Sequence, residues 1–169
     1  MILIYAFSNQ WGTNVSHRVL LELQKIIPAS DLLSYQLIRF HPQNFFKKYI
    51  KNNHYSLIIG LGDYFGNIEK IRIETTAHNV YGQNTISAFS PISLELSLPI
   101  LDYVDSNLFT ISEHMGTYNC NWIAYQTQLY ISQYSPQTKQ LFFHLPKKQP
   151  APILAQNIVK LLQNNNLVQ

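Results

Sequence analysis

Charged side chains are scarce in this sequence. Asp, Glu, Lys and Arg together make up 12% of its 169 residues, about half of the roughly 25% that is usual in globular proteins. The net charge is +3, and the basic residues form no cluster longer than the dipeptides Lys47-Lys48 and Lys147-Lys148. A protein that binds nucleic acid through its phosphates needs a denser positive surface. We therefore expect no nucleic-acid partner.

Cysteine is nearly absent, because Cys120 is the only one in the chain. A single cysteine excludes an intramolecular disulfide and any zinc site built from several cysteines. Five of the six histidines lack the i, i+4 spacing of a helical metal site: His17, His41, His54, His78 and His114. We expect no metal site.

Long hydrophobic runs are also missing. No apolar segment approaches the roughly 20 residues that a helix needs to span a bilayer. The apolar start, residues 1–7, has neither a basic leader nor a small-residue cleavage site, so it does not have the pattern of a signal peptide. These absences predict a protein that is not in a membrane, in the reducing setting of the cytoplasm.

Apolar residues make up 46% of the chain, and neutral amides, 15 Asn and 14 Gln, replace much of the missing charge. This apolar content excludes a disordered chain, and the length is typical of one domain. We find no repeat and no linker, and we expect residues 1–169 to form a single domain.

The first third of the chain alternates between strand and helix patterns. We expect buried strands at 2–7, 32–40 and 55–59, with helices between them at 15–27 and 42–50. This order is typical of a parallel sheet with crossover helices. The remaining expected elements are an exposed strand at 68–75, a loop at 81–97, a short helix at 99–105, a strand at 108–111, a helix at 117–134, a strand at 141–144 and a helix at 152–162. The predicted fold class is α/β, a mostly parallel sheet with helices on both faces.

A glycine-rich segment, residues 60–66, follows the third strand. It superficially resembles a dinucleotide-binding turn, but its third glycine is one place late and the next residues look like a strand. We interpret Gly60 and Gly62 as a plain turn that ends the strand.

Three side chains are candidates for chemistry, and each also has a structural interpretation. Cys120, near the start of a predicted helix, is either a small buried apolar residue or a thiol activated by the helix N-terminus. His144 ends an apolar strand 24 residues later, where it either bonds in the core or acts as a base beside the thiol. Glu74 is unremarkable on an exposed strand, but a third group that orients the imidazole usually accompanies such a pair.

Three separate segments resemble motifs of pyroglutamyl peptidase I, also called pyrrolidone-carboxylate peptidase. Residues 116–125, GTYNCNWIAY, resemble the family's AGTYxCNxxxY motif. Residues 142–146, FFHLP, resemble its FxHxP strand, and residues 73–79, IETTAHN, resemble its IxxERxAxN segment. The strand ending in Phe7, with the residues up to Ser16, is a weaker match to the family's GFxPFGG…NPS entry.

The resemblance implies a twisted α/β sheet and a Cys–His–Glu triad. In it Cys120 is the nucleophile, His144 the general base and then acid, and Glu74 the group that orients His144. The implied reaction is hydrolysis of the amide after an N-terminal pyroglutamyl residue through an acyl-enzyme, without metal or cofactor. The implied partner is a peptide or small amide substrate, and self-association into a homo-oligomer is common in the family.

The resemblance also implies substrate-binding residues. Phe7 corresponds to the first-strand aromatic of the apolar pocket that holds the lactam ring, and Trp11 is a second candidate. Tyr118 and Asn119 belong to the cysteine motif beside the nucleophile. The backbone N–H of Cys120 is a candidate donor to the oxyanion.

The substrate-facing segments depart from the family pattern. Thr75 replaces the arginine after the glutamate, and the family's GQAGGR turn becomes residues 60–65, GLGDYF. The chain is also shorter than usual members, mainly between Glu74 and Cys120. Two hypotheses therefore stand: a cysteine peptidase specific for pyroglutamyl or a similar small acyl group, and a non-catalytic relative that binds a peptide end or a partner protein at the former active-site edge.

Overall fold

A six-stranded sheet with strand order β2-β1-β3-β8-β4-β7 forms the centre of the protein, which is described by a computed structural model at residues 1–9, 11–64 and 66–168. The strands are β1 (Ile2–Phe7), β2 (Leu33–Ile38), β3 (Leu57–Asp63), β4 (Ile71–Glu74), β7 (Phe109–Ser112) and β8 (Lys139–Leu145). Neighbouring strands are parallel except for β4 and β8, which pair antiparallel. The mostly parallel sheet predicted from the sequence is confirmed.

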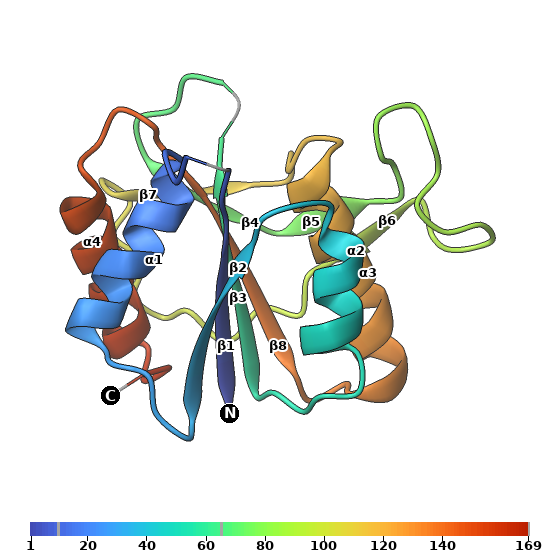
Figure 1. Ribbon diagram of the computed structural model, residues 1–169, viewed down its shortest axis with the longest axis horizontal. Coiled ribbons are helices and arrows are strands. Elements are labelled where there is room, and N and C mark those ends of the chain that lie inside the picture. The colour runs from blue at the N-terminus through green and yellow to red at the C-terminus, as the bar shows by residue number, and fades with distance from the viewer. Residues whose placement is uncertain (10, 65, 169) are drawn as a thin grey trace.

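Helices cover both faces of this sheet. Helices α1 (Val15–Ile26) and α4 (Ala151–Asn164) lie on one face, and α2 (Pro42–Phe45), the π-helical turn η1 (Phe46–Ile50) and α3 (Asn119–Tyr134) lie on the other. Figure 1 shows the first pair to the left of the sheet and α2 and α3 to its right. A small antiparallel pair, β5 (Thr76–His78) and β6 (Ser93–Glu95), packs beside α3. Within the described residues, no helix is both long and apolar enough to cross a membrane.

Strand β1 explains why this fold needs two helical layers. Ile4 and Ala6 pack into the core under α1 and α4, whereas Leu3, Tyr5 and Phe7 pack into the core under α3. All five are buried, because alternate side chains of a strand point to opposite faces of the sheet. A continuous apolar run is therefore the sequence signature of a strand covered on both sides.

The glycine segment after the third strand is not the plain turn that we expected. Strand β3 continues through Gly60 and Gly62 to Asp63. A Cβ atom at Gly60 would lie 2.5 Å from a ring carbon of Phe142, and one at Gly62 would also approach that ring. Both positions require glycine because neighbouring side chains lie directly over the strand. Phe65 lies outside the described residues.

Three further expectations were wrong, and the first two depended on contacts distant in sequence. The strand expected to be exposed, β4, is largely buried, because β8 and β7 pair with its two edges. Segment 99–105 is not a helix. The backbone of Tyr103 bonds instead to the side chain of Asn165, while Leu101 and Val104 pack against the core under α1 and α4. Strand β6 also lies inside the segment that we expected to be a loop.

Candidate active site

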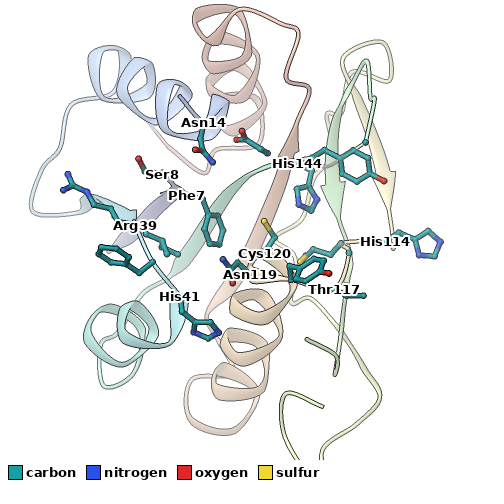
Figure 2. A pocket seen from close by; sticks show the side chains of 18 residues that line it. Phe7, Ser8, Asn14, Arg39, His41, His114, Thr117, Asn119, Cys120 and His144 are labelled. Atoms are coloured by element: carbon teal, nitrogen blue, oxygen red, sulfur yellow. The ribbon is translucent and has the colours of Figure 1, made fainter. Parts of the chain in front are cut away.

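A cavity of about 850 Å³ opens where β1, β2, β3 and β8 end. Its lining includes Phe7 at the end of β1, Asp63 at the end of β3, His144 near the end of β8 and Cys120 in the first turn of α3. Open α/β sheets place their ligands at the carboxyl ends of parallel strands. In the view of Figure 2, the Cys120 sulfur lies between Phe7 and His144.

His144 and Glu74 form a buried hydrogen-bonded pair. His144 Nδ1 lies 2.7 Å from Glu74 Oε1, and the two side chains are 3% and 0% exposed. The His144 ring is also held edge-on between the rings of Tyr64 and Phe142, with centroids 5.5 Å and 5.2 Å away. With Nδ1 bound to the carboxylate and the ring fixed, Nε2 is the nitrogen that remains for chemistry.

Cys120 lies on the same face of the sheet as His144. A Cβ atom at Gly62 would lie 2.7 Å from Cys120 Sγ, and Gly62 pairs directly with His144 across the parallel strands β3 and β8. Paired residues in a parallel ladder point to the same face and their strands lie about 5 Å apart. Among the described residues, no hydrogen bond joins the Cys120 thiol to His144. The sulfur and the imidazole therefore line the same cavity without a hydrogen bond between them.

The Cys120 thiol is held in its protonated form. Burial raises the pKa of the thiol to about 12, and the negative charges of Asp63 and Glu74 act in the same direction. The N–H group of Cys120 itself has a weaker, opposite effect. The N-cap residue of α3, Tyr118, makes no side-chain hydrogen bond to the helix, so the first N–H groups of α3 have no side-chain cap. Such N–H groups are the donors that an oxyanion needs.

Asp63 connects the cavity to the start of α1. Its two carboxylate oxygens accept hydrogen bonds from the backbone N–H groups of Val15 and Ser16, at 3.1 Å and 2.8 Å. The N-cap residue Asn14 makes no side-chain cap bond, so Asp63 takes the place of a local cap. Asn14 lines the cavity, and its Oδ1 atom is buried without a hydrogen-bond partner.

The structure brings most of the predicted substrate-binding residues to this cavity. Phe7, Tyr118 and Asn119 line it, together with the predicted nucleophile and base. Trp11 does not line it and is 75% exposed. Glu74 does not line the cavity, and it contacts His144, which does. No group of three or more His, Cys, Asp and Glu side chains that could hold a metal ion occurs among the described residues.

Sequence reasoning missed a buried side-chain amide, that of Asn121, which joins α3 to residues 78–80. The Asn121 side chain accepts a hydrogen bond from the N–H of His78 and donates to the carbonyls of His78 and Val80, at 2.7–2.8 Å. Asn121 is fully buried. The asparagine directly after the cysteine thus ties the helix that carries the thiol to β5 and the residues that follow it. The available signal was a polar residue on the helix face that also carries the apolar Ala124 and Tyr125.

Solved structures with similar folds are pyrrolidone carboxyl peptidases. The enzyme from Fervidobacterium islandicum AW-1 aligns with a TM-score of 0.77 and 19% identity, covering 98% of this chain and 97% of its own. Pyroglutamyl peptidase I from Bacillus amyloliquefaciens aligns with a TM-score of 0.76 and 21% identity, covering 98% and 94%. The pyrrolidone carboxyl peptidase from Thermus thermophilus aligns with a TM-score of 0.76 and 17% identity, and the alignment covers 98% of this chain and 100% of that enzyme.

The chain has the pyroglutamyl peptidase I fold. The resemblance predicted from three short motifs is thereby confirmed at the level of the fold, across nearly the whole chain. No protein-family model matches the sequence, and no curated protein matches it significantly. The fold has been kept while most of the sequence differs from that of these solved enzymes.

Proposed function

We propose that this protein is a cysteine peptidase that hydrolyses the amide bond after an N-terminal pyroglutamyl residue. The observation that carries the proposal is the buried Glu74–His144 pair, which opens onto the same cavity as Cys120. A thiol beside an imidazole that is itself oriented by a carboxylate is the arrangement used for acyl transfer through a covalent intermediate. The structural neighbours are named for this activity.

The first half of the reaction follows from the protonation state of the thiol. Because the pKa of Cys120 is raised to about 12, the sulfur must lose its proton as it attacks, and His144 Nε2 receives that proton. The carboxylate of Glu74 stabilises the imidazolium that forms. The carbonyl oxygen becomes an oxyanion near the N–H groups at the start of α3. The tetrahedral intermediate then collapses to a thioester, and the leaving amine takes the proton from His144.

The second half returns the enzyme to its starting state. Water adds to the thioester while His144 removes its proton, and the sulfur leaves and is reprotonated. Both steps require Cys120 Sγ and His144 Nε2 to come into hydrogen-bond contact in the substrate complex. Catalytic hydrogen bonds are often longer before substrate binds and shorten in the complex.

The decisive experiment is turnover of a fluorogenic pyroglutamyl amide. We expect hydrolysis by the wild type, and none above background for Cys120→Ser or His144→Ala. His54→Ala is the matched control, because His54 is exposed and does not line the cavity. A wild type with no more activity than Cys120→Ser would remove the proposal. Comparison with the corresponding prolyl and acetyl amides identifies the acyl group that the site accepts.

One observation favours the second hypothesis, a non-catalytic relative. Cys120 makes no hydrogen bond to His144 within the part of the chain that the structure describes, and the high pKa of its thiol lowers its reactivity. A binding protein would retain the cavity without turnover. Calorimetric titration with a pyroglutamyl peptide separates the two: binding without any hydrolysis supports the binding protein, and hydrolysis excludes it.

A further inference from the structure

The cavity is much larger than a lactam ring requires. A volume of about 850 Å³ lies near the upper end of the range for cavities that hold drug-sized ligands, roughly 300–1,000 Å³. A five-membered ring fills only part of it. The remaining space therefore has to be explained by another part of the ligand.

The lining divides into an inner and an outer region. The inner region is apolar and buried, with Phe7, Ile38 and Met115 at 8%, 2% and 3% exposure. The outer region contains Phe40 and Tyr118, which are 86% and 69% exposed, and His41. Aromatic rings of this size are exposed at the mouth of a cavity that also contains the nucleophile.

Two rings of the outer region belong to a packed row. Tyr118 packs edge-on against Tyr81, Tyr81 against His41, and His41 against Trp122, with centroids 6.2, 5.2 and 5.1 Å apart. The Tyr81 hydroxyl donates to Asn119 Oδ1 at 3.1 Å, one residue before Cys120. We call these four residues, 118, 81, 41 and 122, the aromatic row. Of the row, Tyr118 and His41 line the cavity, and Tyr81 and Trp122 support them without lining it.

The direction of the substrate follows from the chemistry of an enzyme that removes an N-terminal residue. The acyl group ends at the N-terminus and can be enclosed, so it occupies the inner region. The peptide chain continues beyond the scissile bond and must leave through the opening. The residue directly after the scissile bond therefore lies in the outer region, against Phe40, His41 and Tyr118.

We propose that the outer region binds an aromatic side chain of the residue immediately after the scissile bond, so that the preferred substrates are pyroglutamyl peptides with an aromatic residue there. This inference rests on the proposed function and names its substrate class. A pair of aromatic rings stabilises a complex by more than the area it buries. The extra interaction energy corresponds to a preference of about two- to tenfold for an aromatic over a small side chain. A small amide without that side chain leaves the outer region empty.

The test compares two peptides, pyroglutamyl-phenylalanyl-alanine amide and pyroglutamyl-glycyl-alanine amide. We expect a kcat/KM for the phenylalanyl peptide that is at least about twofold higher. Phe40→Ala and Tyr118→Ala should each bring the ratio of the two kcat/KM values toward one. The matched control is Tyr134→Ala, because Tyr134 is 68% exposed, close to the 69% of Tyr118, but lies at the other end of α3.

The outcomes separate the two proposals. If neither peptide is hydrolysed by any form of the protein, the proposed function fails. If both are hydrolysed with equal kcat/KM, or if the ratio is the same in wild type, Phe40→Ala and Tyr118→Ala, only the inference about the outer region is overturned. Titration of the inactive variant Cys120→Ser with each peptide measures the two dissociation constants. Their ratio gives the preference for the phenylalanyl peptide in binding alone.

Discussion

The thiol of Cys120 illustrates how a single side chain depends on its charged neighbours. Burial and the carboxylates of Asp63 and Glu74 favour its neutral form. In the proposed reaction the proton of this thiol passes to His144 during attack on the substrate, and the carboxylate of Glu74 stabilises the imidazolium that forms.

Alkylation by iodoacetamide measures this property directly. The rate for Cys120 should rise continuously from pH 7 to pH 11, because the thiolate is the reactive form and the pKa of the thiol is about 12. Asp63→Asn removes one of the negative charges and should increase the rate at pH 8. The urea-unfolded chain serves as the control with an ordinary thiol. An alkylation rate that reaches a plateau below pH 9 in the folded protein would contradict a raised pKa of the Cys120 thiol.

Glu74→Gln tests the orientation of the imidazole and the stabilisation of its charged form. The amide oxygen retains a partner for His144 Nδ1 but carries no negative charge. General acid–base catalysis contributes roughly 10²–10⁴-fold, so kcat should fall by at least about tenfold while KM changes little. The measurement is steady-state turnover of the pyroglutamyl amide. An unchanged kcat would mean that Glu74 only fills the core.

The three candidate residues for chemistry could be picked out because each lies in a short motif whose spacing is visible in the sequence, and their catalytic roles stay a prediction. The carboxylate of Asp63 could not be assigned to α1, because its partners Val15 and Ser16 are 48 and 47 residues away. The rings of the aromatic row come from three separate segments, and no local pattern joins them. Contacts between distant segments are set by the fold.

At the scale of the element, β3 shows how a strand can form the floor of a site. Gly62 leaves the space in which the Cys120 sulfur lies, and Gly60 leaves space for the rings of Phe142 and Tyr5. Two glycines in a central strand cost conformational entropy. The Cys120 sulfur, the Phe142 ring and the Tyr5 hydroxyl lie so close to the strand that they require both glycines.

Gly62→Ala should therefore affect activity more than stability. The new methyl group would lie 2.7 Å from Cys120 Sγ, so the sulfur must move away from the sheet. Overpacking of this kind costs about 1–3 kcal/mol of unfolding free energy, and a displacement near 1 Å at a reacting atom costs roughly 10²-fold in rate. Chemical denaturation and turnover measure the two effects. A variant with full activity would show that the thiol is not confined at this position.

The elements predicted well from periodicity are those with a clear apolar pattern of their own. The spacing of apolar residues located β1, α1, β2, β8 and α4 to within two residues of their bounds, although α1 packs against α4 from the far end of the chain. Strand β4 and segment 99–105 were misjudged because their environments come from β8, β7 and Asn165 at the end of α4. A strand of four residues carries too little pattern to reveal that it is covered on both edges.

For the molecule as a whole, the buried thiol predicts a loss of stability in alkaline solution. In the unfolded chain the Cys120 thiol has the ordinary cysteine pKa of 9.0, and in the folded chain its pKa is raised to about 12. Between these values only the unfolded chain loses the proton, so the free energy of unfolding falls as the pH rises above 9. Tyr35, whose pKa is raised from 10.0 to about 12, adds to the effect at higher pH.

Thermal unfolding between pH 8 and pH 10 checks this prediction. The melting temperature of the wild type should fall as the pH rises above 9, and Cys120→Ala should flatten that fall because it removes the titrating group. Tyr35→Phe is the matched control, because its effect should begin only above pH 10. Identical pH profiles for the wild type and Cys120→Ala would show that the thiol titrates normally in the folded protein.

The position of β8 determines the order in which the molecule can assemble. It is the last strand in the chain, yet it lies between β3 and β4. Until residues 139–145 arrive, two strands expose unpaired edges, which attract other chains. Glu74 and His144, 70 residues apart, meet only when β8 inserts. The hydrogen bond between Glu74 and His144 is thus completed at the step that closes the sheet, and a chain halted before that step has an exposed gap and an incomplete candidate site.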